Sequence, residues 1–184
     1  SFRLTLADGV GARWIGKVRS RGTDERPVIL AQALRRAGLV GEGGASVGVP
    51  RPLGVVDAHH LSLFERVDGT PATTLLLAGS DPHAVASQMA TAMTMLHRAS
   101  VSARRRRTVA DELETLRVRT AAWQDQEPSL APALSRMALR CAALAEPLRH
   151  RAPRTLLHRD LYPDQLLLDG TRTWIVDLDL AADG

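Results

Sequence analysis

The sequence contains little cysteine, lysine or aromatic residue, and it has no long hydrophobic run. Its single cysteine, Cys141, excludes an internal disulfide framework and a zinc site built on several cysteines, which favours a reducing compartment. The longest apolar runs, such as Thr74–Gly79, fall far short of the roughly 20 residues that a helix needs to cross a bilayer. We therefore expect a soluble, cytoplasmic protein with no membrane partner.

The scarcity of aromatic residues also bears on nucleic-acid binding. Only three Trp, two Phe and one Tyr are present, and they are scattered along the chain. The four adjacent arginines Arg104–Arg107 would therefore lack aromatic platforms on which bases stack. A formal net charge of +4 does not by itself indicate nucleic acid. We interpret the four arginines as the solvated approach to a helix and expect no nucleic-acid partner.

What remains is a hydrophobic content of 45% in 184 residues, enough for one domain or for two small lobes that share a cleft. The chain does not begin with Met, and its last residues follow directly on a strongly patterned segment, so we interpret it as a fragment. All its other basic residues of the Lys and Arg type are arginines, which makes the position of the one lysine, Lys17, worth following.

The first 67 residues predict a small sheet that carries one helix. Alternating residues predict a hairpin with a turn at residues 7–9, and apolar residues at helical spacing predict a helix from Pro27 to Gly38. A glycine-rich loop is expected at residues 41–48. The expected extended segments are Phe2–Leu6, Trp14–Val18, Val49–Val56 and Leu61–Val67.

The following residues, up to about 148, have the spacing of helices. Ser80 or Asp81 is a suitable cap for a helix with Pro82 in its first turn, and its methionines are expected in the core. Two more helices are expected at residues 109–123 and 131–148.

Two carboxylates near the end of the chain form the main candidate site. Asp160 and Asp177 each lie beside an apolar strand, and a turn at Asp169-Gly170 predicts a hairpin between those strands. If Gln165 starts the first strand and Asp177 ends the second, the hairpin brings both to the same end. A carboxylate and an amide oxygen there suit a hard cation such as Mg²⁺. Asp160 then remains free to face a substrate hydroxyl.

The pattern His158-Arg159-Asp160, an amide residue five positions later, and Trp-Ile-Val-Asp177-Leu-Asp179 resembles the aminoglycoside phosphotransferase and choline kinase-like family. Other segments resemble elements of the family in the same order along the chain. Phe2–Val18 resembles the strand pair that ends in the nucleotide-contacting lysine, and residues 63–69 resemble the hinge between the lobes. Residues 49–52 resemble the start of the next strand, and Leu96-His97 the end of the first large-lobe helix.

The resemblance implies an α+β, two-lobed protein-kinase-like fold. Residues 1–67 would form an incomplete N-terminal sheet lobe with the hinge, and residues 68–184 a truncated, mainly helical C-terminal lobe. The implied activity is transfer of the γ-phosphoryl group of ATP, with Mg²⁺, to a hydroxyl of a small-molecule acceptor.

The resemblance also implies residue roles. Lys17 would bind the α- and β-phosphates, and Glu65 and Val67 would present backbone groups to the adenine edge. Asp177 would hold Mg²⁺, and Gln165 would be either its second ligand or a structural amide. Asp160 would accept the proton of the acceptor hydroxyl, while His158 would brace the catalytic loop.

Three departures from the family pattern keep an alternative open, one of them being the expected truncation of the fold at both ends. Gln165 stands where the family usually has Asn, and the first helix offers no clear acidic partner for Lys17, since Glu25 lies about one turn early and Gln32 is neutral. Asp179 is assigned either to a second metal or to the cap of the following turn. The alternative function is a catalytically impaired nucleotide-binding or regulatory kinase-like module.

Overall fold

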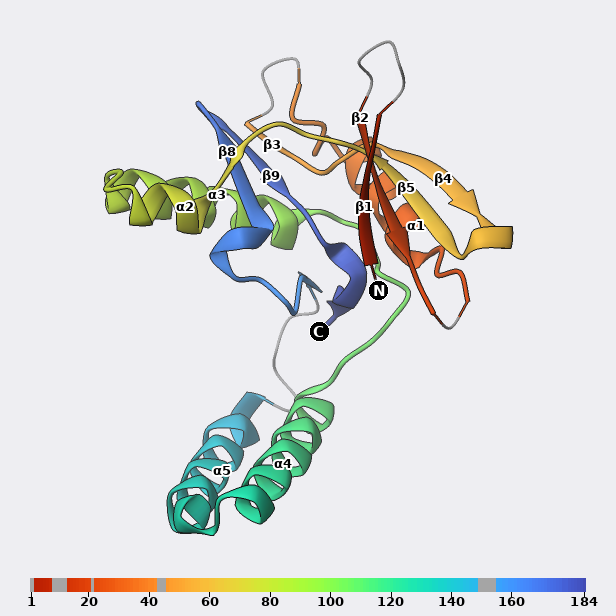
Figure 1. Ribbon diagram of the computed structural model, residues 1–184. Helices are drawn as coiled ribbons and strands as arrows, with labels where there is room; N and C mark the ends of the chain where they lie inside the picture. Colours follow the sequence, from red (N-terminus) through yellow and green to blue (C-terminus); the bar gives the residue numbers. More distant parts are fainter. Residues whose placement is uncertain (1, 8–12, 21, 43–45, 149–154) are drawn as a thin grey trace. The chain divides into compact units, whose positions relative to one another are not determined.

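The computed structural model describes residues 2–7, 13–20, 22–42, 46–148 and 155–184. The chain forms two compact units, one of residues 1–104 with 156–182 and the other of residues 105–155 with 183–184 (Figure 1). Both halves of the predicted site, the lysine strand and the carboxylate hairpin, therefore belong to the first unit. A boundary after residue 67 stays a prediction.

The first sheet of this unit is antiparallel and contains the predicted hairpin. Strand β1 (Phe2–Ala7) pairs with β2 (Arg13–Val18), so the hairpin is confirmed, while its turn lies mostly outside the described residues. The other strands are β4 (Pro52–Val56) and β5 (Leu61–Glu65), joined by a 3₁₀ turn at Asp57–His59, and the order is β1-β2-β5-β4 (Figure 1).

Helix α1 (Arg26–Arg36) follows the hairpin, and both of its ends are encoded locally. Pro27 occupies the first turn, where a missing N–H costs no hydrogen bond. At the other end Gly38 adopts a φ of +100°, and its N–H donates to the carbonyl oxygen of Arg35 at 3.0 Å. The N–H of Leu39 donates to the carbonyl of Leu34 at 3.1 Å, which completes a Schellman motif. The predicted helix is thus confirmed.

The second sheet has the order β3-β9-β8-β6 and holds the carboxylate hairpin. Its strands are β3 (Val47–Gly48), β6 (Thr70–Pro71), β8 (Leu166–Asp169) and β9 (Arg172–Ile175). The expectation of a loop throughout residues 41–48 was wrong at its end, because Val47 and Gly48 pair in parallel with Thr173 and Trp174. A partner 126 residues away (173 minus 47) leaves no local signal in so short a strand.

Helices α2 (Ala72–Leu77) and α3 (Pro82–Arg98) come after β6 and before β8 along the chain. Asp81 caps α3 as predicted, because its carboxylate accepts a hydrogen bond from the N–H of His83 at 3.0 Å. The sequence analysis missed α2, which is short, contains two β-branched threonines and has no side-chain cap. Two further strands, β7 (Leu156–Leu157) and β10 (Ala182–Asp183), have two residues each.

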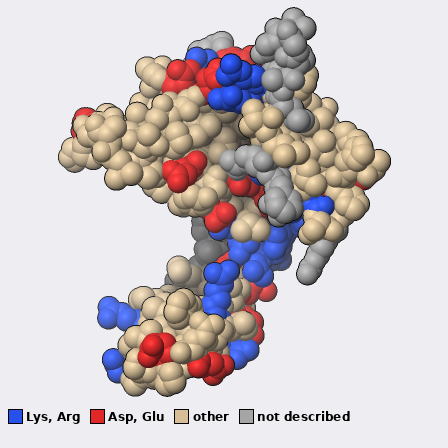
Figure 2. Space-filling model, viewed as in Figure 1, with Lys and Arg blue, Asp and Glu red and all other residues tan. Residues whose placement is uncertain are grey.

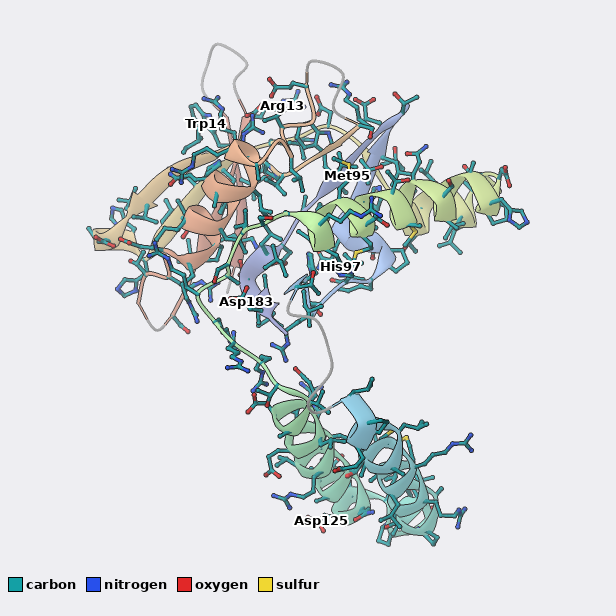
Figure 3. The ribbon with its side chains drawn as sticks, turned by 180° about the vertical axis from the view of Figure 1, so that it is seen from behind. Arg13, Trp14, Met95, His97, Asp125 and Asp183 are labelled. Carbon is teal, nitrogen blue, oxygen red and sulfur yellow. The ribbon has the colours of Figure 1, made fainter. Side chains whose placement is uncertain are left out.

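One hydrophobic core joins α1, α3 and the second sheet. Leu34, Leu96, Leu166 and Ile175 are completely buried in it. Two of the three methionines of α3 behave as predicted, since Met89 and Met95 pack against this cluster while partly buried; Met95 is labelled in Figure 3. The carboxylate hairpin and the helix that follows the lysine strand are therefore fixed in one packed body.

The second unit contains helices α4 (Val109–Gln126) and α5 (Ala131–Ala145), with 3₁₀ turns at Pro128–Leu130 and Glu146–Leu148. Thr108 and Asp111 form a capping box at the start of α4. In this view, both basic and acidic side chains are scattered over the two helices (Figure 2). Within the described residues, no helix combines the length and apolarity of a membrane span.

Gly48 lies where a side chain has no room. A Cβ atom there would lie 2.6 Å from the backbone nitrogen of Gly41 and 2.7 Å from a ring carbon of Trp174. We expect Gly48→Ala to lower the free energy of unfolding in urea by about 1–3 kcal/mol, because backbone atoms cannot move aside cheaply. Ser46→Ala, at a nearby exposed position, serves as control and should change it by less than about 0.5 kcal/mol. Equal stabilities would contradict this packing.

His158 is buried in the first unit and is held by the hairpin. Its side chain is 1% exposed, and its Nε2–H donates to the carbonyl oxygen of Val176 at 2.8 Å. Its Nδ1 is buried and has no hydrogen-bond partner within the described part of the chain. Burial lowers the pKa of His158, although the Val176 bond and the charges of Asp177 and Asp160 oppose this. The imidazole is therefore neutral in the folded protein near pH 7.

This pKa shift makes stability depend on pH. Below the ordinary pKa of about 6.5, His158 binds a proton in the unfolded chain but not in the folded one. Its contribution to the free energy of unfolding is therefore fully present above that pH. It is then lost as the pH falls from 6.5 through the folded pKa. Urea unfolding between pH 8 and pH 5 should show this decline, and His158→Gln should flatten it whatever its stability at pH 8. An equal slope in both proteins would contradict the assignment.

Candidate functional site

A cavity of about 450 Å³ opens in the first unit between the two sheets and α1. Apolar side chains, among them Ile15, Phe64 and Ile175, form much of its wall. Four of the residues predicted from the sequence line it together. They are Lys17 of β2, Glu65 at the end of β5, Val67 just beyond that strand, and Asp177 just beyond β9.

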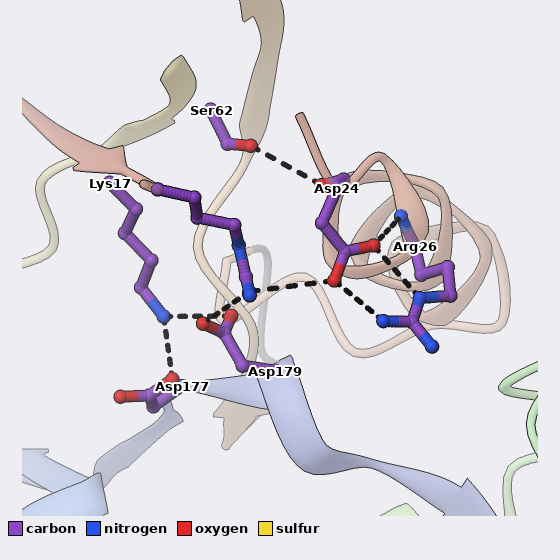
Figure 4. Close-up of polar contacts among 7 residues, drawn as sticks. Lys17, Asp24, Arg26, Ser62, Asp177 and Asp179 are labelled. Carbon is purple, nitrogen blue, oxygen red and sulfur yellow. Dashed lines mark hydrogen bonds and ion pairs between the residues drawn. The ribbon is translucent and has the colours of Figure 1, made fainter. Parts of the chain in front are cut away.

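The lysine strand and the carboxylate segment meet at this cavity. The Nζ atom of Lys17 donates hydrogen bonds to Oδ1 of Asp177 at 2.6 Å and to Oδ1 of Asp179 at 3.0 Å (Figure 4). The Lys17 side chain is only 12% exposed, so these charges interact in a partly desolvated place. Helix α1 contains no acidic residue, and the lysine takes its carboxylates from the segment after β9 instead.

A second cation continues the network beyond Asp179. Arg19 Nη2 lies 2.6 Å from Asp179 Oδ2 and 3.6 Å from Asp24 Oδ2. Asp24 also accepts hydrogen bonds from the side chain and the backbone N–H of Arg26, and the side-chain bond is the main cause that lowers the pKa of Asp24 (Figure 4). The hydroxyl of Ser62 donates to the Asp24 carbonyl at 3.4 Å.

Sequence reasoning missed Arg19 and Asp24, and it gave Asp179 to a second metal or a turn cap. In the structure, the Asp179 carboxylate bonds Lys17 and Arg19. One local signal was available: residues two apart in a strand lie on the same face, so Lys17 and Arg19 point the same way. The hydrogen bond from the N–H of Arg19 to the carbonyl of His60 continues the ladder past β2.

Two non-glycine residues with positive φ flank the site. Asp177 has φ 64° and ψ 56°, and Arg159 has φ 68°. Such left-handed conformations cost free energy in residues with a Cβ atom and concentrate at functional sites. Asp177 stands two positions after the end of β9, and its carboxylate bonds Lys17. The left-handed conformation therefore occurs where the strand has ended and the site begins.

Gln165 lies at the same end of the hairpin as Asp177, because its backbone pairs with Val176. The strands pair Leu166 with Ile175, and the N–H of Val176 donates to the carbonyl oxygen of Gln165 at 3.0 Å. The start of the strand was predicted one residue early, because Gln165 ends a 3₁₀ turn (Pro163–Gln165) and β8 begins at Leu166. The Gln165 side chain is buried.

Asp160 is exposed on a bend that follows buried His158. Neither Asp160 nor Gln165 is among the described residues that line the cavity. The charges of Asp177 and Asp160 both raise the pKa of His158, while that of Lys17 lowers it, although burial is the largest influence. All three charges thus act on one buried imidazole, which ties the bend to the hairpin through its bond to Val176.

The donor chemistry here is compatible with a hard divalent cation. Asp177 offers a carboxylate and Gln165 an amide oxygen, and Mg²⁺ prefers oxygen ligands. Within the described residues, no group of three or more His, Cys, Asp and Glu side chains could hold a metal ion by itself. A Mg²⁺ ion would therefore take most of its ligands from substrate phosphates and water, as is common for this metal.

We compared the chain with known protein families, curated sequences and solved structures. The sequence matches the phosphotransferase enzyme family (APH) over residues 1–184. Comparison with curated protein sequences gives no significant match.

Solved structures share the fold at low sequence identity. The spectinomycin phosphotransferase APH(9)-Ia, in complex with ADP and spectinomycin, is 13% identical with a TM-score of 0.68, over 98% of this chain and 64% of that chain. APH(2″)-IIa, in a ternary complex with streptomycin and ATP, is 13% identical with a TM-score of 0.65, over 100% and 67%. A choline/ethanolamine kinase family protein from Mesorhizobium loti is 16% identical with a TM-score of 0.62, over 99% and 56%.

The chain thus spans between about half and two thirds of the length of these proteins. Their likeness confirms the predicted kinase-like fold of sheets and helices, and the family match extends from the lysine strand to the carboxylate hairpin. The chain belongs to the phosphotransferase enzyme family.

Proposed function

We propose that this chain forms the nucleotide-binding and catalytic part of a phosphotransferase that moves the γ-phosphoryl group of ATP to a hydroxyl of a small molecule, with Mg²⁺ as cofactor. The observation that carries the proposal is the position of Lys17, whose ammonium group bonds Asp177 and Asp179 at an apolar cavity. A cation held beside carboxylates at an apolar pocket suits a ligand with one flat apolar part and one polyanionic part.

The apolar part of the cavity would receive the adenine base. The N–H of Glu65 already donates to the carbonyl oxygen of Arg51 at 2.8 Å, so the Glu65 carbonyl would accept and the Val67 N–H would donate at the base edge. Backbone recognition leaves the Glu65 carboxylate free to bond Arg51, as it does at 3.0 Å. Among the similar structures, one contains ADP and another ATP.

The charged part would receive the phosphates. Lys17 would neutralise the α- and β-phosphates, and Asp177 with Gln165 would hold Mg²⁺. When bound, the ion would neutralise the charge that spreads over the transferring phosphoryl group. Because phosphoryl transfer needs little covalent chemistry from the protein, the contribution of these residues is to position and neutralise.

Asp160 would act on the acceptor. Its exposed carboxylate would orient the acceptor hydroxyl and take its proton, while the bond of His158 to Val176 fixes the bend that carries it. Neutral His158 has its only N–H engaged in that bond, so we assign it a bracing role rather than that of the base. The acceptor is a small hydroxylated molecule.

A second candidate function is binding of nucleotide without transfer, as in a regulatory module. Two observations favour it: Gln165 replaces the usual asparagine, and Lys17 bonds directly to Asp177, the expected metal ligand. Nucleotide binding without product formation for any hydroxylated acceptor would support this function and contradict the first.

The test of transfer is Asp160→Asn. We expect kcat to fall by about 10²- to 10⁴-fold, because the acceptor loses its general base, while the Kd for ATP stays unchanged. ADP release measured with a panel of sugars, amino alcohols and aminocyclitols, together with ATP binding by calorimetry, checks both. Asp169→Asn, in the hairpin turn where Asp169 bonds Arg172, is the charge-matched control and should keep its activity. Full activity of Asp160→Asn would refute the role.

Gln165 is tested through the Mg²⁺ dependence of the rate. Gln165→Asn should keep or lower the Mg²⁺ concentration at half-maximal rate, because the shorter amide still offers an oxygen in the arrangement usual for the family. Gln165→Leu should raise it several-fold, because the amide oxygen is lost. Mg²⁺ curves for Gln165→Leu that match those of the wild type would show that Gln165 is structural only.

A further inference from the structure

We propose that Asp179 is the positioning residue for Lys17, and that it does the work for which α1 lacks an acidic residue. The proposal rests on the proposed function, because it concerns the nucleotide-contacting lysine of that site. It assigns to a turn carboxylate the task of holding the ammonium group where phosphates would bind.

The geometry of Asp179 is that of a bridge between two cations. Its Oδ1 accepts from Lys17 at 3.0 Å (Figure 4). Its Oδ2 accepts from Arg19 at 2.6 Å, so each carboxylate oxygen has a cationic partner. The Asp179 side chain is 16% exposed, so this bridge is shielded from solvent more than an ordinary surface pair. The 3₁₀ turn Leu178–Leu180 fixes its backbone, and Leu178 is buried in the core.

Among the described residues, Lys17 has two carboxylate partners, Asp177 and Asp179, with different expected roles. Asp177 Oδ1 also bonds Lys17, at 2.6 Å, yet Asp177 is the residue expected to bind a divalent ion. A divalent ion and an ammonium group compete for the same carboxylate. Asp179 remains as a partner for Lys17 when Asp177 binds a divalent ion, so the ammonium group stays in the cavity.

Arg19 keeps this bridge in place from the strand side. Its backbone N–H bonds the carbonyl of His60, and its guanidinium group lies between Asp179 and Asp24. Arg19 therefore ties Asp179 to the residues that precede α1. In this network three cations, Lys17, Arg19 and Arg26, face three carboxylates. The formal charges of this network therefore cancel.

The composition of the chain allows a direct test, because Lys17 is its only lysine. In the full chain labelled with ¹⁵N-lysine, one side-chain ammonium signal reports on Lys17 alone. We expect a visible signal in the wild type, because bonded ammonium protons exchange slowly with water, and its loss or marked shift in Asp179→Asn. The Kd for Mg²⁺–ATP should rise about tenfold, as expected when a hydrogen bond between charged groups is lost. Asp179→Glu keeps the carboxylate and should therefore recover part of the wild-type lysine signal and part of the wild-type affinity for Mg²⁺–ATP.

Asp24→Asn is the matched control. Asp24 carries the same charge, has a similar exposure of 13%, and shares Arg19 as partner, but within the described residues it bonds no atom of Lys17. Because it acts on Lys17 only through Arg19, its effect on the lysine signal should be much smaller than that of Asp179→Asn. A wild-type lysine signal and a wild-type Kd in Asp179→Asn would overturn the proposal. The lysine signal is measured without nucleotide, so it does not depend on phosphoryl transfer. If the signal responds to Asp179→Asn but the wild-type protein transfers no phosphate, only the proposed function is contradicted.

Discussion

The structure of the site depends on one ion-paired contact, between Lys17 of the first sheet and the two carboxylates that follow the second. Lys17 and Asp177 are 160 positions apart in the sequence, and their side chains meet at 2.6 Å. Opposite charges in a partly desolvated place attract strongly, but each is costly if left alone there. The contact therefore requires that both sheets be held in register by something other than the charges themselves, and the hydrophobic core of the first unit supplies this.

That core explains how a short hairpin can place functional groups accurately. Leu166 and Ile175 face each other across the hairpin and are completely buried, so the next residues, Gln165 and Val176, are fixed too. His158 adds a polar tie, because its bond to Val176 links the bend that carries Asp160 to the same hairpin end. The left-handed backbone of Asp177 is tolerated because packing on both sides of it over-determines its position.

Short-range residue patterns in the sequence predicted most elements of this unit. The β1–β2 hairpin follows from alternation, α1 from Pro27 and Gly38, and α3 from the Asp81 cap. Two elements escaped prediction for different reasons. Helix α2 is too short to show a period, and β3 exists because a distant strand pairs with Val47 and Gly48, where the absence of a Cβ atom lets Trp174 approach. Short elements stabilised by distant partners leave little trace in their own residues.

The sequence by itself determined the chemical inventory: a lone lysine at a strand end, a histidine two positions before an aspartate, and a hairpin that brings an amide residue and a carboxylate to the same end. These follow from residue type and short-range spacing, which the chain encodes locally. Only the tertiary structure decided the partners of Lys17 and the bridge from Asp179 to Arg19. The physical reason is that an ion pair has no sequence period: any of several carboxylates can satisfy an ammonium group, and packing of the sheets and α1 selects the ones within reach.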